Sequence, residues 1–169
     1  MDEEQLDAID VIVDQWRHER PDLDLSPLGI FGRLMRLSML LGTDVERWCA
    51  QHGLRNGEFD VLTALRRCGP PFAQTPSELA GALMMSRAGM TKRLDRLESA
   101  GLVERSLDAA DRRSFRIALS AQGREVIDAA LTEHAANLAR LTAALSPEQR
   151  TGLEQSLRAL LSAAGPGRP

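Results

Sequence analysis

The chain has 169 residues and a formal net charge of −3, with 43% apolar and 27% charged residues. This composition is typical of a globular protein of one domain with extensions, and abundant Leu and Ala without Tyr favour helices over sheet. No apolar run reaches the roughly 20 residues of a membrane span. The first residues, MDEEQLDAID, are acidic, which is the reverse of a targeting signal, so we expect a cytoplasmic protein.

Residue types that carry catalysis or bind metals are scattered along the chain. Cys49 and Cys68 form no C-x-x-C pair, and His18, His52 and His134 have no metal-ligand spacing. The sequence contains no Gly-rich phosphate loop, nucleophile elbow or H-E-x-x-H motif. We therefore expect no metal, no cofactor, no disulfide and no enzymatic activity.

The charges are unevenly distributed. Residues 1–30 hold nine acidic side chains against two arginines, whereas residues 87–116 hold eight basic side chains against five acidic ones. Local potential rather than net charge governs association with a polyanion, so the second segment suits nucleic acid despite the low isoelectric point. Helical proteins that bind no nucleic acid can show the same patchiness.

Two helices are predicted in the N-terminal third. The first covers residues 3–19 and ends before Pro21. Ser26 as N-cap and Pro27 at the first helical position start a second helix that runs to about His52. Its apolar stripe extends over about seven turns, and a helix of that length in a small chain usually packs against a partner.

A third, short helix is predicted from Asn56 to about Cys68. Its apolar positions Phe59, Leu62 and Leu65 recur at helical spacing and are expected to face the core. The following stretch, CGPPFAQ, is predicted to be a loop.

Residues 75–101 predict a helix, a tight turn and a second helix. Thr75 and Glu78 form a capping box at the start of the first helix. Ser86 is a suitable N-cap for the second helix, and Gly101 is suitable just past its C-terminus. In a helix-turn-helix the second member lies in the major groove of DNA.

The second of these helices has one apolar and one cationic face. Met90, Leu94 and Leu97 are expected to face the core, while Lys92 and Arg96 lie on the opposite side beside two small residues. Such a face suits a groove lined with phosphates. A solvated amphipathic helix of an ordinary helical protein would have the same pattern.

A change of period after this helix predicts a β-hairpin. Leu102–Glu104 form a brief strand, SLDAADRR is turn-like, and Phe115, Ile117 and Leu119 alternate as a second strand. A helix-turn-helix followed by a hairpin is a winged helix. The predicted fold is mainly α with a small β-wing.

The C-terminal third predicts two more helices. Ser120 starts a long helix to about Leu145, and Ser146 starts a last helix that ends before the tail. Their apolar residues recur at spacings of three and four, which indicates packing along another helix. We expect the N- and C-terminal helices to bury these seams in a two-fold dimer, with packing inside one chain as the alternative.

Residues 75–123, TPSELAGALMMSRAGMTKRLDRLESAGLVERSLDAADRRSFRIALSAQG, resemble the winged-helix core of the MarR family of bacterial transcription regulators, including DRRS at the wing and L-[ST]-x-x-G into the next helix. The flanking helices match that family's dimerisation elements. The resemblance implies a homodimer whose recognition helices enter successive major grooves of a palindromic operator, while the wings reach flanking minor grooves.

The resemblance also implies which residues contact DNA. The recognition-helix candidates are Ser86, Arg87, Gly89, Thr91, Lys92 and Arg96, and the wing candidates are Arg112 and Arg113. Asp111 is expected to orient one wing arginine through an ion pair. The alternative is that the two wing arginines are plain surface charges.

A narrower resemblance concerns a small-molecule effector. The stretches DQWRHERPDLDLSPLGIFGRLMRLS and GEFDVLTALRR are similar to the urate-responsive PecS/HucR branch of the family. That branch's ligand set falls on Trp16, Asp60, Arg67 and Arg93. An indole stacks on a flat purine, arginines pair with an anionic oxidised purine, and Asp60 would sense that charge by repulsion.

Helical spacing supports part of this set. Asp60 and Arg67 fall on one stripe of their helix, away from its core-facing side, and Arg93 borders the buried side of the recognition helix. A ligand drawn to Arg93 would pull on that helix and weaken DNA binding. The alternative is a structural ion-pair network, with Trp16 as a core anchor.

These predictions divide the chain into four parts. They are the N-terminal helices for dimerisation and one wall of the ligand pocket (1–55), the winged helix-turn-helix DNA-binding domain (56–119), the C-terminal dimerisation helices (120–164) and a disordered tail (165–169).

Two other functions remain open. The first is a redox-sensing regulator of the same fold that uses Cys49 or Cys68, although their apolar surroundings predict burial. The second is a winged helix that contacts only proteins, against which the basic wing argues.

Overall fold

The computed structural model describes residues 6–108 and 114–165, and the chain forms two compact units, Met1–Asn56 and Gly57–Pro169. The described part is mainly helical with one small antiparallel sheet, as the sequence predicts. None of its helices is both long and apolar enough to cross a membrane.

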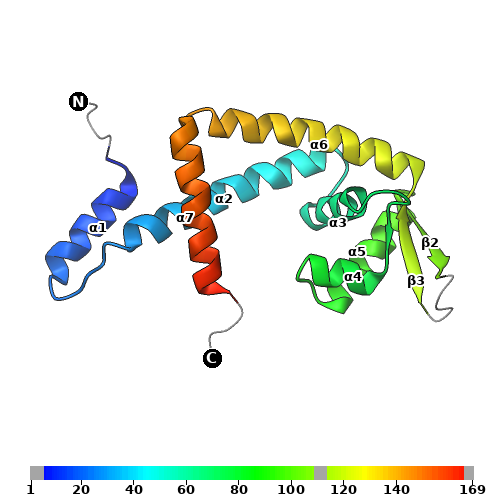
Figure 1. Cartoon of the computed structure of the whole chain (residues 1–169), viewed down its shortest axis with the longest axis horizontal. Coiled ribbons are helices and arrows are strands. Elements are labelled where there is room, and N and C mark those ends of the chain that lie inside the picture. Colours follow the sequence, from blue (N-terminus) through cyan, green and yellow to red (C-terminus); the bar gives the residue numbers. More distant parts are fainter. Residues whose placement is uncertain (1–5, 109–113, 166–169) are drawn as a thin grey trace. The chain divides into compact units, whose positions relative to one another are not determined.

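The first unit contains helices α1 (Ala8–Glu19) and α2 (Leu28–Gln51), which pack against each other (Figure 1). Helix α1 begins later than predicted because Asp7 is its N-cap, with a carboxylate that accepts from the backbone N–H of Ile9 and Asp10. A capping box formed by Asp7 and Asp10 completes this start.

The start of α2 also differs from the prediction. Its N-cap is Pro27, and no side chain caps the helix, so the prediction of Ser26 as N-cap is wrong. Ser26 belongs to the preceding turn, where its backbone N–H donates to the carboxylate of Asp24 at 3.0 Å. The long apolar helix therefore starts without a side-chain cap.

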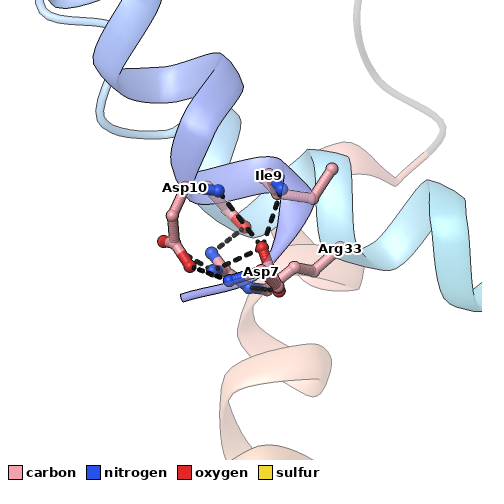
Figure 2. Close-up of polar contacts among 5 residues, drawn as sticks. Asp7, Ile9, Asp10 and Arg33 are labelled. Carbon is pink, nitrogen blue, oxygen red and sulfur yellow. Dashed lines mark hydrogen bonds and ion pairs between the residues drawn. The ribbon is translucent and has the colours of Figure 1, made fainter. Parts of the chain in front are cut away.

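Arg33 of α2 fastens the N-terminal end of α1 (Figure 2). Its Nε and Nη2 donate to Asp7 at 2.8 and 3.0 Å, and Nη2 lies 2.6 Å from Oδ1 of Asp10. The Arg33 hydrogen bond is the main reason why the pKa of Asp10 is lowered. The two helices also pack closely beside these ion pairs, because a Cβ at Gly32 of α2 would come 3.0 Å from Ile9 Cγ2 of α1.

The second unit begins with a winged helix and continues into two long helices (Figure 1). Its elements are α3 (Asn56–Arg67), β1 (Ala73–Gln74), α4 (Pro76–Ala82), α5 (Arg87–Ser99), β2 (Val103–Leu107), β3 (Phe115–Leu119), α6 (Ala121–Thr142) and α7 (Pro147–Ala164).

The sheet has the strand order β1-β3-β2, and both pairings are antiparallel. The hairpin of β2 and β3 pairs Val103 with Leu119 at one end and Leu107 with Phe115 at the other. Strand β1 is an addition to the prediction, which placed a loop there. It is two residues long and too short to show the alternation that identifies a strand in a sequence.

The apolar positions of α3 and α5 that helical spacing predicted to face the core are confirmed as buried. Fully or almost fully buried side chains come from α3, α4, α5, β3 and α6, and include Phe59, Leu62, Leu65, Leu79, Met90, Leu94, Leu97, Ile117 and Ile127. The helix starts at Thr75 and Ser86 are also confirmed, because both side chains accept hydrogen bonds from the first turns of α4 and α5. Gly101 ends α5 with a φ of 70°.

The L-[ST]-x-x-G motif has a clear packing role. Ser120 caps α6 by accepting from the Gly123 N–H at 2.9 Å, and its hydroxyl donates to the Gly101 carbonyl at 2.6 Å. A Cβ at Gly123 would stand 1.9 Å from the Leu102 carbonyl oxygen. Only glycine at this position allows the first turn of α6 to lie this close to Leu102, the residue before β2.

The two C-terminal helices have much of their apolar surface exposed. In α6, Ile127 is buried, whereas Leu138 and Leu141 are 46% and 43% exposed. No residue of α7 is buried, and Leu161 is 74% exposed. The predicted seam is thus only partly covered in the single chain.

Candidate nucleic-acid interface and effector site

Helix α5 presents a polar outer face near its N-terminus. Arg87, Thr91 and Lys92 are all exposed, and the Thr91 hydroxyl donates to the Arg87 carbonyl at 3.1 Å. Within the part of the chain that the structure describes, Arg87 and Lys92 take part in no ion pair. Their charges are therefore available to a ligand, beside the positive end of the helix dipole.

Two other recognition-helix candidates have structural roles as well. Ser86 is exposed, and its Oγ accepts from the Gly89 N–H at 3.2 Å to cap the helix. Gly89 is half-buried, and a Cβ there would come 3.1 Å from Ser86 Oγ and 3.2 Å from Arg93 Nη1. A side chain at this position would therefore crowd Ser86 and Arg93.

The prediction that Arg96 faces outward is wrong. Its side chain is 33% exposed, and its Nε lies 2.7 Å from Oε1 of Glu58, a residue of α3 that is only 7% exposed. The helical wheel placed Arg96 opposite the apolar face, but a long side chain at the edge of a helix can turn toward a buried partner. Arg96 therefore joins α5 to α3.

Two other cations of the basic segment, Arg105 and Arg116, are also paired with carboxylates. Arg105 of β2 pairs with Asp95 and, at 2.8 Å, with Glu98, both on α5. Arg116 of β3 lies 3.3 Å from Asp108 and donates to a backbone carbonyl of β1. These pairs connect the wing to its neighbours and reduce the number of free charges.

The predicted wing contacts, Arg112 and Arg113, lie outside the described residues, as does Asp111. Their roles stay predictions.

Three of the four predicted effector residues, Asp60, Arg67 and Arg93, lie in the second unit, and their charges act on one another. Asp60 is half-buried on α3, and burial raises the pKa of its carboxyl, while the positive charges of Arg93 and Arg67 act in the opposite direction. Burial is the larger effect. The charges of the two arginines thus act on a half-buried carboxylate.

Arg93 turns into the protein, as predicted. Its Nη1 donates to the Gly89 carbonyl at 3.1 Å, and its guanidinium lies against the backbone of Gly57. A Cβ at Gly57 would come 2.2 Å from Arg93 Nε. The arginine thus occupies space that only a glycine leaves open at the start of α3.

The fourth residue, Trp16, belongs to the first unit, so its place in this set stays a prediction. It is 46% exposed, which contradicts the alternative of a buried core anchor. An exposed indole is available to stack on a planar ligand.

The two cysteines differ in exposure. Cys49 is fully buried, as predicted. Cys68 is exposed, so the prediction of burial is wrong there: it follows the last residue of α3, beyond the apolar stripe, and its thiol donates to the Leu65 carbonyl at 2.9 Å. Across residues 6–108 and 114–165, no cluster of three or more potential metal-ligating side chains forms.

Sequence reasoning missed Gly57 and Glu58. An acidic residue in the first turn of a helix is explained by the helix dipole alone, so nothing local marks Glu58 as the partner of Arg96. The signal that could have identified Gly57 is its type, because glycine inside a helix costs stability unless something packs against it.

A helix-turn-helix followed by an antiparallel hairpin, with a cationic outer face on the second helix, defines a winged helix-turn-helix protein. The sequence pattern of the MarR family matches residues 52–114. The chain is 41% identical to the HTH-type transcriptional regulator PecS of Dickeya dadantii (strain 3937) over 150 residues, which cover 89% of this chain and 88% of that protein. The chain therefore belongs to the MarR family, and the predicted fold and family are confirmed.

Solved structures show the same architecture. A mutant of MarR from E. coli complexed with operator DNA is similar with a TM-score of 0.68 and 26% identity, covering 82% of this chain and 99% of that chain. AbsC, a MarR family transcriptional regulator from Streptomyces coelicolor, has a TM-score of 0.76 and 24% identity, covering 84% of this chain and 96% of that chain.

Proposed function

We propose that this protein is a sequence-specific regulator, a repressor, that binds double-stranded DNA as a homodimer on a palindromic operator. A small anionic ligand such as urate attenuates this binding. The observation that carries the proposal is the outer face of α5, where Arg87, Thr91 and Lys92 are exposed and the two cations are unpaired within the described residues.

The chemistry of this face suits a major groove. Arginine and lysine pair with guanine O6 and N7 or with phosphate, and a threonine methyl packs against the methyl of thymine. Ser86 and Gly89 at the start of α5 let the helix end approach the DNA backbone. Arg112 and Arg113 are proposed to enter the flanking minor groove, where narrow A·T-rich segments attract arginine. The similarity to a MarR mutant complexed with operator DNA supports DNA binding by this chain.

The homodimer is supported by exposed apolar side chains on the N- and C-terminal helices. Phe31 and Met35 of α2 are 50% and 68% exposed, and Leu138 of α6 and Leu161 of α7 are exposed too. Exposed apolar side chains on both units favour an interface, and a two-fold dimer would bury the same residues on both copies. Such a dimer would present two recognition helices to a palindrome.

The effector proposal rests on Asp60, Arg67 and Arg93, whose charges act on one another in the second unit. A planar anion would pair with the arginines, and Trp16 would stack on its ring. Because Arg93 belongs to the recognition helix, an anion that binds it changes the free energy of the DNA-bound orientation. The 41% identity to PecS supports the assignment to this branch of the family.

Selection from genomic fragments followed by footprinting tests DNA binding. The dimer should protect a near-palindrome with half-sites about one helical turn apart. No protected sequence at low salt would exclude the DNA-binding function. Retention on heparin that falls steeply with salt would separate this function from a module that contacts only proteins.

Titration with urate tests the effector. The chain has two tryptophans, Trp16 and Trp48, so a change of emission that disappears in Trp16→Phe reports binding at the proposed site. Urate should also release the operator. Unchanged emission and undiminished DNA binding at millimolar urate would exclude urate and leave the DNA-binding function intact.

A further inference from the structure

We infer that Arg96 positions the recognition helix instead of contacting DNA, and that the first turn of α3 sets the orientation of α5. The inference rests on the proposed function, because it assigns different roles to the cations of the helix proposed to read DNA. Three groups of contacts carry it.

The first contact is the ion pair between Arg96 and Glu58. Glu58 is buried, with 7% of its surface exposed, and its Oε1 lies 2.7 Å from Arg96 Nε. Separating them would remove an ion-pair partner at 2.7 Å from a carboxylate in a largely dry environment, which is costly. An Arg96 side chain that reached out to DNA would have to abandon this carboxylate.

The second contact is made one turn earlier on the same helix. The Arg93 guanidinium lies against the backbone of Gly57, the residue before Glu58. Arg93 and Arg96 therefore rest on two successive residues of α3. Two contacts with neighbouring residues of α3 restrict the rotation of α5 more than either contact alone.

The third group of contacts holds α5 from the wing. Arg105 of β2 pairs with Asp95 and Glu98 on α5. Ion pairs thus join α5 to α3 and to β2, and they neutralise the positive charges of Arg96 and Arg105. Arg87 and Lys92 are then the α5 cations that remain exposed and unpaired within the described residues.

Salt dependence distinguishes a residue that contacts phosphate from one that positions the helix. Removing a phosphate contact lowers the slope of log affinity against log salt by about 0.9 and weakens binding to all sequences. Removing a positioning contact misplaces the base-reading side chains, so affinity for the operator falls while non-specific affinity and the salt slope are kept. Loss of folded protein would lower both affinities equally.

The experiment compares Glu58→Gln, Arg96→Gln and the double variant with Lys92→Gln in the full-length protein. Affinities for the selected operator and for an unrelated duplex are measured at several salt concentrations, and circular dichroism gives the folded fraction. Glu58→Gln and Arg96→Gln should each lower operator affinity about tenfold and spare non-specific affinity and slope. The double variant should be no worse than either single variant. Lys92→Gln should lower the slope by about 1.

A different result would overturn the inference. If Arg96→Gln lowers the slope and the non-specific affinity as Lys92→Gln does, while Glu58→Gln has no effect, Arg96 contacts DNA directly. Additive effects of the two changes would also contradict a shared role. If Glu58→Gln does not fold, Glu58→Asp keeps the charge and shortens the side chain, and it should lower only operator affinity. A wild-type protein without operator binding would instead overturn the proposed function.

Discussion

Gly57 and Arg93 are in such close contact that a β-carbon at Gly57 would lie 2.2 Å from Arg93 Nε and 2.8 Å from Cζ. The side chain that would have to move is the flexible end of an arginine. Gly57→Ala should therefore leave the fold intact and displace the Arg93 guanidinium without changing any charge. We expect it to weaken the effect of the anionic ligand on DNA binding about tenfold.

The measurement is the ligand concentration at which half of the operator is released. Gly152→Ala is the control, because no atom outside the neighbouring residues and the backbone of its own helix lies within 4 Å of a Cβ placed at Gly152. Equal ligand responses of Gly57→Ala and the control would show that the position of Arg93 does not matter to the effector.

Asp60 supplies a test that depends on pH. Burial raises the pKa of its carboxyl above the ordinary value of 3.8, although Arg93 and Arg67 oppose the change. Because the pKa is higher in the folded than in the unfolded protein, the protonated carboxyl favours the folded state. This contribution to stability is fully present below pH 3.8, and it is lost as the pH rises through the folded-state pKa. Asp60→Asn should thus have a higher Tm than the wild type at pH 7.

The difference in Tm between Asp60→Asn and the wild type should decrease as the pH falls and should vanish below about pH 4. Thermal melts from pH 3 to 8 provide the measurement. A lower Tm for Asp60→Asn at pH 7 would mean that attraction to the two arginines outweighs the cost of burial.

The contact between Gly123 and Leu102 predicts a large loss of stability. In Gly123→Ala the new methyl would overlap the Leu102 carbonyl oxygen, which stands 1.9 Å from the Cβ position, and backbone cannot move aside as a side chain can. We expect a loss on the order of 3 kcal/mol in the free energy of unfolding. Denaturant titration measures it.

The matched control is Gly81→Ala in α4, where no atom outside the neighbouring residues and the backbone of its own helix lies within 4 Å of the new Cβ. It should be neutral or should stabilise by up to about 1 kcal/mol, because alanine is a better helix former. If both variants unfold at the same denaturant concentration, the close approach of α6 to Leu102 is not a constraint.

The contacts of Arg33 with Asp7 and Asp10 are expected to stabilise α1 against local unfolding. Arg33→Ala removes the bonds to Asp7 and Asp10, so amide exchange in α1 should be about tenfold faster at pH 7. Arg47→Ala, which breaks an exposed pair with Asp44 inside α2, is the control and should leave α1 unchanged. Equal exchange in both variants would show that apolar packing alone holds α1.

Low pH should weaken the ion pair between Arg33 and Asp10. The pKa of Asp10 is lowered from its ordinary value of 3.8 in the folded protein, so the stabilisation is present above that value and is lost as the pH falls below it. Wild type and Arg33→Ala should therefore converge in α1 protection at low pH.

Local signals explain why most of the fold could be predicted. The caps at Thr75, Ser86 and Ser120 depend on the residue itself and its neighbours three positions on, and the core faces depend on a period of 3.6. Strand β1 escaped prediction because a two-residue strand is defined by its partner β3 and has no pattern of its own.

The candidate site was less predictable because its contacts join distant segments. Arg93 was correctly placed from the border of its helix face, but the wheel could not show that Arg96 has a buried carboxylate within reach on α3. The exposure of Cys68 depends on where α3 ends, and element boundaries are poorly determined by periodicity. The sequence identifies the basic residues, but only the fold shows which of their side chains form ion pairs and which do not.

The most direct test of the account measures operator affinity for the wild type and for Arg87→Ala, Lys92→Ala and Arg158→Ala. Each change removes one exposed positive charge, and only the first two lie on α5. Operator affinity should fall about tenfold or more for the two α5 variants and stay within twofold of the wild type for Arg158→Ala. Equal affinities for all four proteins would contradict recognition of DNA by this face.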